Sequence, residues 1–167
     1  MASQAAPPLA PEIERRFQAW IAGAAACEAL SFPEVRRGVQ ALSARYVEGR
    51  GQDGIGAGAL AGAGLRVAFA SFYAPLHFLI ASAVGTALPG AWRDGTERVI
   101  DLGAGTGAVG AALALRCGGA RVLALDRSGW ALGEAQRCFS ALGVAGRTRR
   151  VELPAGHQSH MTIGSPV

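Results

Sequence analysis

The sequence predicts an α/β protein in which an all-helical segment precedes a small parallel sheet. Three observations support this prediction. Apolar residues recur at helical spacing before residue 90, strand-like and helix-like runs alternate after it, and a glycine-rich turn follows the first of those strands. We therefore divide the chain into four parts: a flexible arm (1–10), a helical segment (11–90), an α/β half-domain (91–153) and an irregular tail (154–167).

The helical segment contains three expected helices. Pro11 suits a first helical turn, where its missing N–H is not required, and an apolar face follows: Ile13, Phe17, Trp20, Ile21 and Ala24. Ser31 and Glu34 have the spacing of a capping box. The helix that they begin should bury Val35, Val39, Leu42 and Tyr46. Residues 49–64 are expected to form a glycine-rich loop, and residues 65–88 a mostly buried helix, bent or interrupted near Pro75.

The longest uncharged run, residues 67–84, reaches the lower limit for a transmembrane helix. Pro75 and His77 near its middle favour a core helix instead. Tyr73 and His77, four residues apart, are expected to pack in the core rather than to line a cleft. The first residues lack the basic start and the apolar core of a signal peptide. We therefore expect a cytoplasmic protein with no membrane partner.

The net charge of +4 comes from arginine without any lysine. Spread along the sequence, it is poor support for nucleic-acid binding, because such proteins concentrate charge in a patch. Arg147, Arg149 and Arg150 could contact a phosphate backbone, but a solvated strand edge is the simpler interpretation. The three cysteines are far apart and form no CxxC pair, so we expect neither a disulfide framework nor a metal site.

After residue 90 the pattern is strand–helix–strand–helix–strand, which is typical of a parallel sheet covered by helices. The expected strands are residues 98–102, 120–126 and 147–153, and the expected helices are residues 108–116 and 128–142. In the expected order three-two-one, the first strand lies at an edge of the sheet. An exposed apolar edge strand invites pairing with another chain, so we expect self-association through this edge.

The turn at residues 103–107, GAGTG, lies between the first strand and a helix. Glycine permits a tight turn and lets a ligand approach the backbone closely, and the helix N-terminus offers free N–H groups. Asp101, just before the turn, would repel the pyrophosphate of a dinucleotide. The same carboxylate would attract the ammonium and sulfonium groups of S-adenosylmethionine. Asp126, which ends the second strand, could accept hydrogen bonds from the ribose hydroxyls of either cofactor.

From residue 98 to about residue 153 the sequence resembles the start of the class I S-adenosylmethionine-dependent methyltransferases. VIDLGAGTG (99–107) matches the first motif of this superfamily, and LALD (123–126) matches its acidic strand end. The resemblance implies a Rossmann-like sheet and S-adenosyl-L-methionine as cofactor. It also implies that the methionine part contacts Asp101, Gly103, Ala104, Gly105, Thr106 and Gly107, that Asp126 contacts the ribose, and that Arg127 and Ser128 flank the adenosine. The helical lead ending in FASFYAPLHFLIASAV is similar to that of ribosome-associated methyltransferase-like proteins.

Residues 154–167 match neither the fourth strand of the superfamily nor its acceptor-positioning residues. We therefore expect an incomplete sheet, either truncated or completed by another chain, and no catalytic base can be named. The leading hypothesis is methyl transfer from S-adenosylmethionine to an unidentified acceptor. A non-catalytic methyltransferase-like module that binds RNA or a ribosomal particle is the alternative. An NAD(P)-dependent oxidoreductase is less favoured, because GTGAVG (105–110) fits a dinucleotide whereas Asp101 opposes it.

Overall fold

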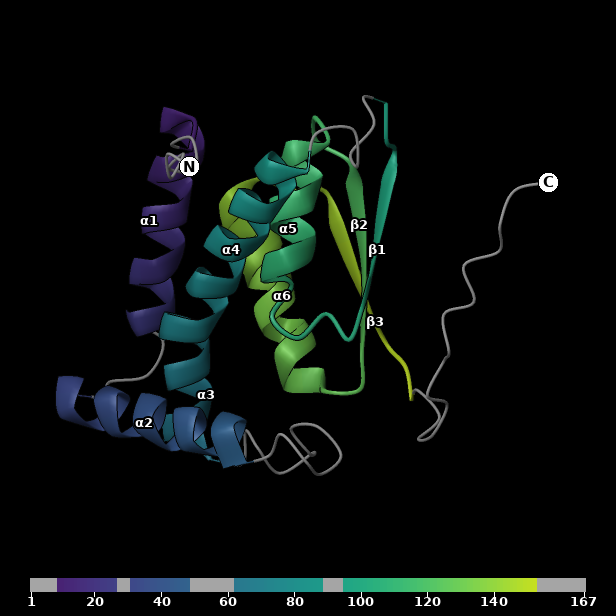
Figure 1. Ribbon diagram of the computed structural model, residues 1–167. Coiled ribbons are helices and arrows are strands. Elements are labelled where there is room, and N and C mark those ends of the chain that lie inside the picture. The colour runs from purple at the N-terminus through teal and green to yellow at the C-terminus, as the bar shows by residue number, and fades with distance from the viewer. Residues whose placement is uncertain (1–8, 27–30, 49–61, 89–94, 153–167) are drawn as a thin grey trace.

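The computed structural model describes residues 9–26, 31–48, 62–88 and 95–152 (Figure 1). The helical elements that come first are α1 (Pro11–Ala26), α2 (Phe32–Glu48), α3 (Ala63–Ala68), the π-helical turn η2 (Phe69–Tyr73) and α4 (Ala74–Ala87). They are followed by β1 (Arg98–Leu102), α5 (Ala108–Arg116), β2 (Arg121–Asp126), α6 (Gly129–Leu142) and β3 (Gly146–Arg150). The predicted fold class, helices followed by an α/β unit with a parallel sheet, is confirmed.

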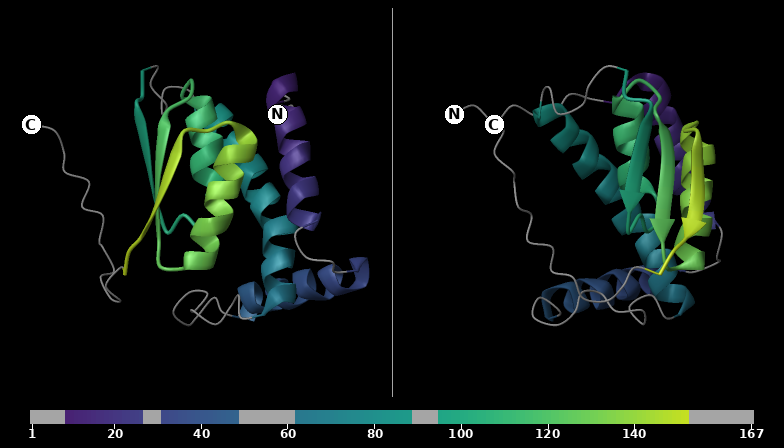
Figure 2. Two further views of the ribbon diagram at one scale, coloured as in Figure 1. Left: turned by 180° about the vertical axis from the view of Figure 1, so that it is seen from behind. Right: turned by 90° about the vertical axis from the view of Figure 1, so that its right-hand side faces the viewer.

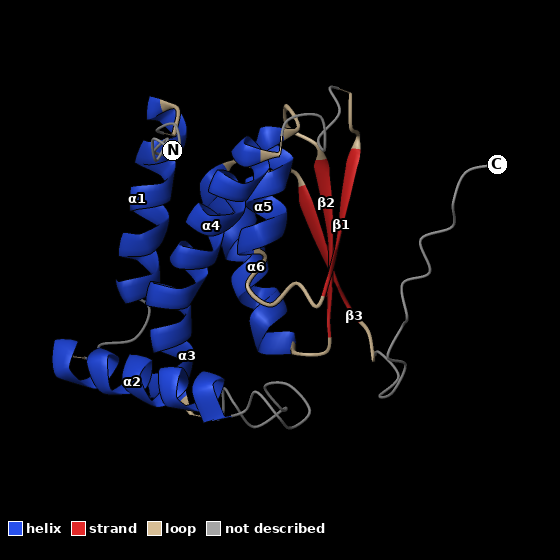
Figure 3. Cartoon of the chain, in the orientation of Figure 1, coloured by secondary structure: helices blue, strands red, loops and turns tan. Residues whose placement is uncertain are grey.

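The strands form one parallel sheet in the order β1-β2-β3. β1 is therefore an edge strand, as the sequence predicts. The helices lie on one side of the sheet, and no described helix covers its other face (Figures 2 and 3). The right-hand view of Figure 2 looks onto this open face, with α4 lying beyond the free edge of β1.

The core joins the helical segment to the α/β unit. Phe17 and Trp20 of α1 pack against the ring of Phe78 in α4, with ring centroids 5.0 and 6.2 Å away. Alanines fill most of the remaining space in α5, where Ala111 and Ala114 are fully buried. Small side chains let neighbouring elements approach closely, so an alanine-rich sequence builds a dense core from few large residues.

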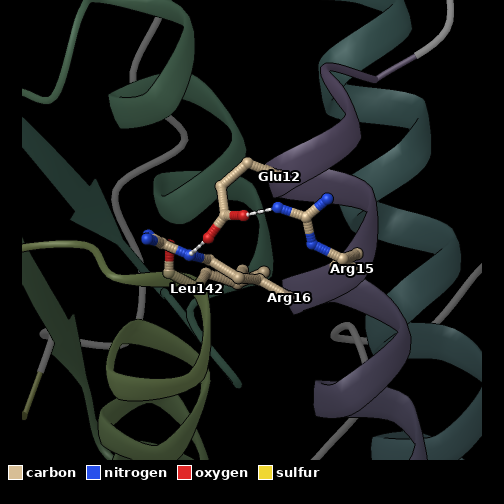
Figure 4. Close-up of polar contacts among 4 residues, drawn as sticks. All are labelled: Glu12, Arg15, Arg16 and Leu142. Atoms are coloured by element: carbon tan, nitrogen blue, oxygen red, sulfur yellow. Dashed lines mark hydrogen bonds and ion pairs between the residues drawn. The ribbon is translucent and has the colours of Figure 1, made fainter.

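α1 is also held to the C-terminal end of α6 by polar contacts (Figure 4). Arg16 donates from Nη1 to the carbonyl of Leu142, at 3.3 Å, and from Nε to the carboxylate of Glu12, at 2.8 Å. Glu12 also pairs with Arg15. A guanidinium at a helix C-terminus satisfies a carbonyl that has no partner within the helix and complements the helix dipole.

The long helix from α3 to α4 is buried on one side only, so the expectation of a mostly buried helix is wrong. Large side chains along its outer side are between 39% and 51% exposed: Phe72, Leu76, Leu79, Ile80, Val84 and Leu88. The helix is apolar on all sides, but within the described residues its main neighbours are α1, α2 and α5, and they cover only part of its surface. In the described part of the chain, Ala63–Ala87 is the one helix long and apolar enough to cross a membrane, a property that core helices of soluble proteins share.

The expected disturbance near Pro75 is the π-helical turn η2, in which the N–H of Ala74 donates to the carbonyl of Phe69. Pro75 has no N–H to continue the α-helical pattern, and the wider turn absorbs this loss within an unbroken helix. One half of the expected capping box forms, because Glu34 Oε2 accepts from the backbone N–H of Ser31 at 2.8 Å; the Ser31 hydroxyl donates to the same oxygen, and the N–H of Glu34 donates to the Ser31 carbonyl. Leu42 is buried as predicted. Most of the expected glycine-rich loop, the Tyr46 side chain and the tail lie outside the described residues.

Candidate cofactor site

The turn after β1 has the backbone shape that only glycine adopts easily. Gly103, Gly105 and Gly107 have φ angles of 69°, 54° and 71°, all in the left-handed region. The N–H groups of Gly103 and Ala104 both donate to the carbonyl of Leu125, which ties the turn to the end of β2. Gly107 is the N-cap of α5. The three glycines that the sequence singles out are therefore required by the backbone itself.

The space around these glycines differs. A Cβ atom on Gly103 or Gly105 would meet no atom within 4 Å. A Cβ on Gly107 would lie 2.9 Å from both Ala135 and the ring of Phe139 on α6. Gly107 therefore permits α5 and α6 to pack, whereas Gly103 and Gly105 leave their backbone open to a ligand.

Asp126 links the turn to the start of α6. Its Oδ2 accepts from the N–H of Gly105 at 2.8 Å, and its Oδ1 accepts from the N–H of Ser128 at 2.7 Å. Ser128 in turn caps α6, since its hydroxyl oxygen accepts from the N–H of Ala131. One carboxylate thus positions the glycine turn and the following helix against each other.

Asp101 lies against the first turn of α5. Its Oδ2 accepts from the N–H of Gly110 at 3.0 Å. Burial raises the pKa of Asp101 above its usual value, the hydrogen bond from Gly110 opposes this rise, and the negative charge of Asp126 adds to it. The two acids predicted from the sequence are therefore close enough to influence each other.

Gly110 was not predicted as a site residue, although it is the last glycine of GTGAVG. A Cβ at this position would lie 2.7 Å from Asp101 Oδ2, so glycine is what allows α5 to approach the carboxylate. The sequence does contain the relevant glycine, because Gly110 follows Gly107 by three residues in GTGAVG. It was assigned only to a dinucleotide pattern.

The remaining predicted site residues contribute in different ways. Thr106 is buried as a whole residue, with 4% of its surface exposed, and Ala104 packs partly against the core, so neither side chain presents a group to a ligand. Arg127 is exposed and directly follows Asp126.

Among the described residues, no group of three or more His, Cys, Asp or Glu side chains could hold a metal ion. Cys117 and Cys138 are buried free thiols.

The helical segment reaches the same end of the sheet as the turn. The guanidinium of Arg66 in α3 lies 5.6 Å from the ring centroid of Trp130, in the first turn of α6 beside Ser128. This is a cation–π contact. Farther along the same helix, Tyr73 and His77 pack with Phe69 in an aromatic cluster, and burial lowers the pKa of His77. The sequence showed no sign that Arg66 and Trp130 would meet.

A parallel β–α–β–α–β unit with a glycine turn after its first strand and an acid at the end of its second is a Rossmann-like unit. Residues 86–162 match the model of the methyltransferase small domain, which is a class I S-adenosylmethionine-dependent methyltransferase family. This part of the chain therefore matches a class I methyltransferase family, as its motifs predict. Methyltransferases of this family generally use S-adenosylmethionine. No curated protein and no solved structure matches the chain.

Proposed function

We propose that this chain binds S-adenosylmethionine at the carboxyl ends of β1 and β2 and serves in methyl transfer to an acceptor. The observation that carries the proposal is the partly buried carboxylate of Asp101 beside the open backbone of Gly103 and Gly105. Within the described residues, no ion pair neutralises Asp101 or Asp126. A ligand with positive charge would supply what the protein does not.

The bound cofactor would supply an electrophilic methyl group on a cationic sulfur. Asp101 would attract the positive charge of the methionine part, and the exposed backbone around Gly103 and Gly105 would let that part approach. The same carboxylate occupies the N–H of Gly110 in the first turn of α5, where a pyrophosphate would otherwise bind. This favours S-adenosylmethionine over a dinucleotide.

Asp126 would hold the ribose. A carboxylate has about four lone-pair sites on its two oxygens. The N–H groups of Gly105 and Ser128 occupy one site on each oxygen. Each oxygen can therefore still accept a hydrogen bond from one ribose hydroxyl while the turn stays in place.

Calorimetric titration of the folded protein with S-adenosylmethionine and with S-adenosylhomocysteine tests this function. We expect binding of both compounds, and Asp126→Asn should weaken it by about 10-fold or more, because hydrogen bonds to charged groups are worth about 1.5–3 kcal/mol. Glu97→Gln, which changes an exposed acid just before β1 begins, is the matched control and should bind as the wild type does. A wild type that binds NADH but neither adenosyl compound would refute the proposal.

We further propose that the chain self-associates through the edge of β1. Arg121 donates to the carbonyl of Glu97, and Gly103 donates to that of Leu125. Because alternate residues of a strand bond to the same neighbour, the N–H of Ile100 points to the free edge. The Ile100 side chain is 62% exposed as well.

Ile100→Pro should abolish this self-association, because it removes an edge donor and leaves the hydrogen bonds between β1 and β2 in place. Ile100→Val keeps the donor and is the control. Sedimentation velocity over a range of protein concentrations measures the effect. A monomeric wild type, or a proline variant that associates as strongly as the wild type, would contradict this proposal.

A further inference from the structure

The open face of the sheet gathers arginines from all of its strands. Side chains alternate between the two faces of a strand, and residues in register on parallel neighbours share a face. Val122 and Ala124 are buried under the helices, so Arg121 lies on the open face. The register places Arg98 beside Arg121, Arg147 beside Leu123, and Arg149 beside Leu125. The open face therefore carries four arginines: Arg98, Arg121, Arg147 and Arg149.

No ion pair within the described residues neutralises these four arginines, although Glu97 lines a hollow together with Arg98 and Arg121. None of them takes part in an ion pair or side-chain hydrogen bond within the described part of the chain. The acids within the strands, Asp101 and Asp126, lie on the helix-covered side. Arg98 and Arg121 lie on strands only about 4.8 Å apart, where like charges repel each other. An anion bound against this face would relieve that repulsion.

Three of the arginines surround one concavity. Arg98, Arg121 and Arg147 line a hollow of about 660 Å³ at the amino ends of the strands, with Leu123 also in its wall. The fourth, Arg149, continues the row along β3. Its Cα lies about 6.6 Å from that of Arg147, since a strand rises about 3.3 Å per residue. The positive charges are thus distributed along the sheet rather than focused on one point.

We propose that the open face of the sheet binds the phosphodiester backbone of single-stranded RNA. Guanidinium groups match the geometry of phosphate oxygens and are weakly hydrated, so they suit this ligand. A row of separated charges fits a ligand that repeats its negative charge, as a polynucleotide does, better than a single phosphate. The side chains between the arginines are apolar, and they can contact bases that are exposed in a single strand and stacked inside a duplex.

This surface is separate from the cofactor site. Arg98 and Arg121 are the first residues of their strands, whereas the glycine turn and Asp126 lie at the opposite, carboxyl ends. RNA binding here is thus independent of cofactor binding. The strand register thus brings together four arginines that are dispersed in the sequence.

Fluorescence anisotropy with a labelled oligouridylate of about 12 nucleotides tests the proposal. Four phosphate contacts predict a slope of about −3 for log K against log salt, so affinity should fall about 50-fold between about 50 and about 200 mM salt. The triple variant Arg98→Gln, Arg121→Gln, Arg147→Gln should reduce this slope to about −1. It removes mutually repelling charges, so it should fold at least as well as the wild type, which circular dichroism would check.

The control is a triple variant with the same change in charge on exposed helix positions: Arg15→Gln, Arg36→Gln and Arg37→Gln. It should keep the salt slope of the wild type. Equal slopes for the two triple variants would overturn the proposal, as would an absence of binding at low salt. Polyglutamate that displaced the RNA at equal charge concentration would show that the face recognises an acidic polypeptide instead. A duplex that bound more tightly than the single strand would also overturn the assignment.

Discussion

Replacing Asp101 with asparagine should weaken S-adenosylmethionine binding by about 10- to 100-fold and at the same time stabilise the protein at neutral pH. Asparagine keeps an oxygen that can accept from the N–H of Gly110, so the contact between β1 and α5 survives. It removes the partly buried negative charge that burial and Asp126 both disfavour. We therefore expect affinity and stability to change in opposite directions, as they do where a strained group serves a function.

The pH dependence of unfolding gives an independent measure of this effect. The pKa of Asp101 is higher in the folded protein than its ordinary value of 3.8, so the folded state binds the proton more tightly than the unfolded chain. The contribution of Asp101 to stability is therefore greatest below the unfolded pKa, and it is lost as the pH rises through the folded pKa. The Asp101→Asn variant lacks this loss.

Urea unfolding of the wild type and the variant between about pH 3 and about pH 7 would show the difference. The advantage of Asp101→Asn should grow as the pH rises through the pKa of Asp101 and then become constant. Glu97→Gln, at an exposed position, should show no such trend. If Asp101→Asn were less stable than the wild type at neutral pH, the carboxylate would be a structural element rather than a ligand-binding group.

Alanine at Gly107 should destabilise the fold by about 2–5 kcal/mol. A left-handed φ costs a residue with a Cβ about 1–2 kcal/mol, and overpacking adds about 1–3 kcal/mol. Both apply here, because φ is 71° and the new Cβ would press on Ala135 and Phe139. Chemical denaturation would measure the loss.

Alanine at Gly105 is the matched comparison. It carries the cost of the left-handed conformation, about 1–2 kcal/mol, but its Cβ would meet no protein atom within 4 Å. Its main effect should therefore be on the ligand, whose approach to the backbone the Cβ would obstruct, and calorimetry should show reduced affinity in a protein that remains folded. Unchanged affinity in Gly105→Ala would contradict the role of Gly105 in ligand binding. Unchanged stability in Gly107→Ala would contradict the role of Gly107 in packing.

The sequence was most informative where structure is decided locally. The strand–turn–helix from β1 to α5 follows from a short apolar strand, glycines at positions that need positive φ, and a helix-forming run after them. The contact between Ser31 and Glu34 is also local, since it depends on residues three positions apart. These elements could be placed from the sequence because their causes lie within a few residues.

The sequence alone therefore determined the class of fold, the order of the strands and the turn with its two acids. Hydrophobic periodicity and the positive φ angles that require glycine both depend on residues close together in the sequence. Only the tertiary structure decided which surfaces remain uncovered. The outer side of α4 stays exposed because burial depends on the neighbours that are present, and no helical pattern specifies those. In the same way, arginines separated by up to about fifty residues of chain lie on one face of the sheet. The pairing of strands depends on residues far apart in the sequence, so local propensity does not predict it.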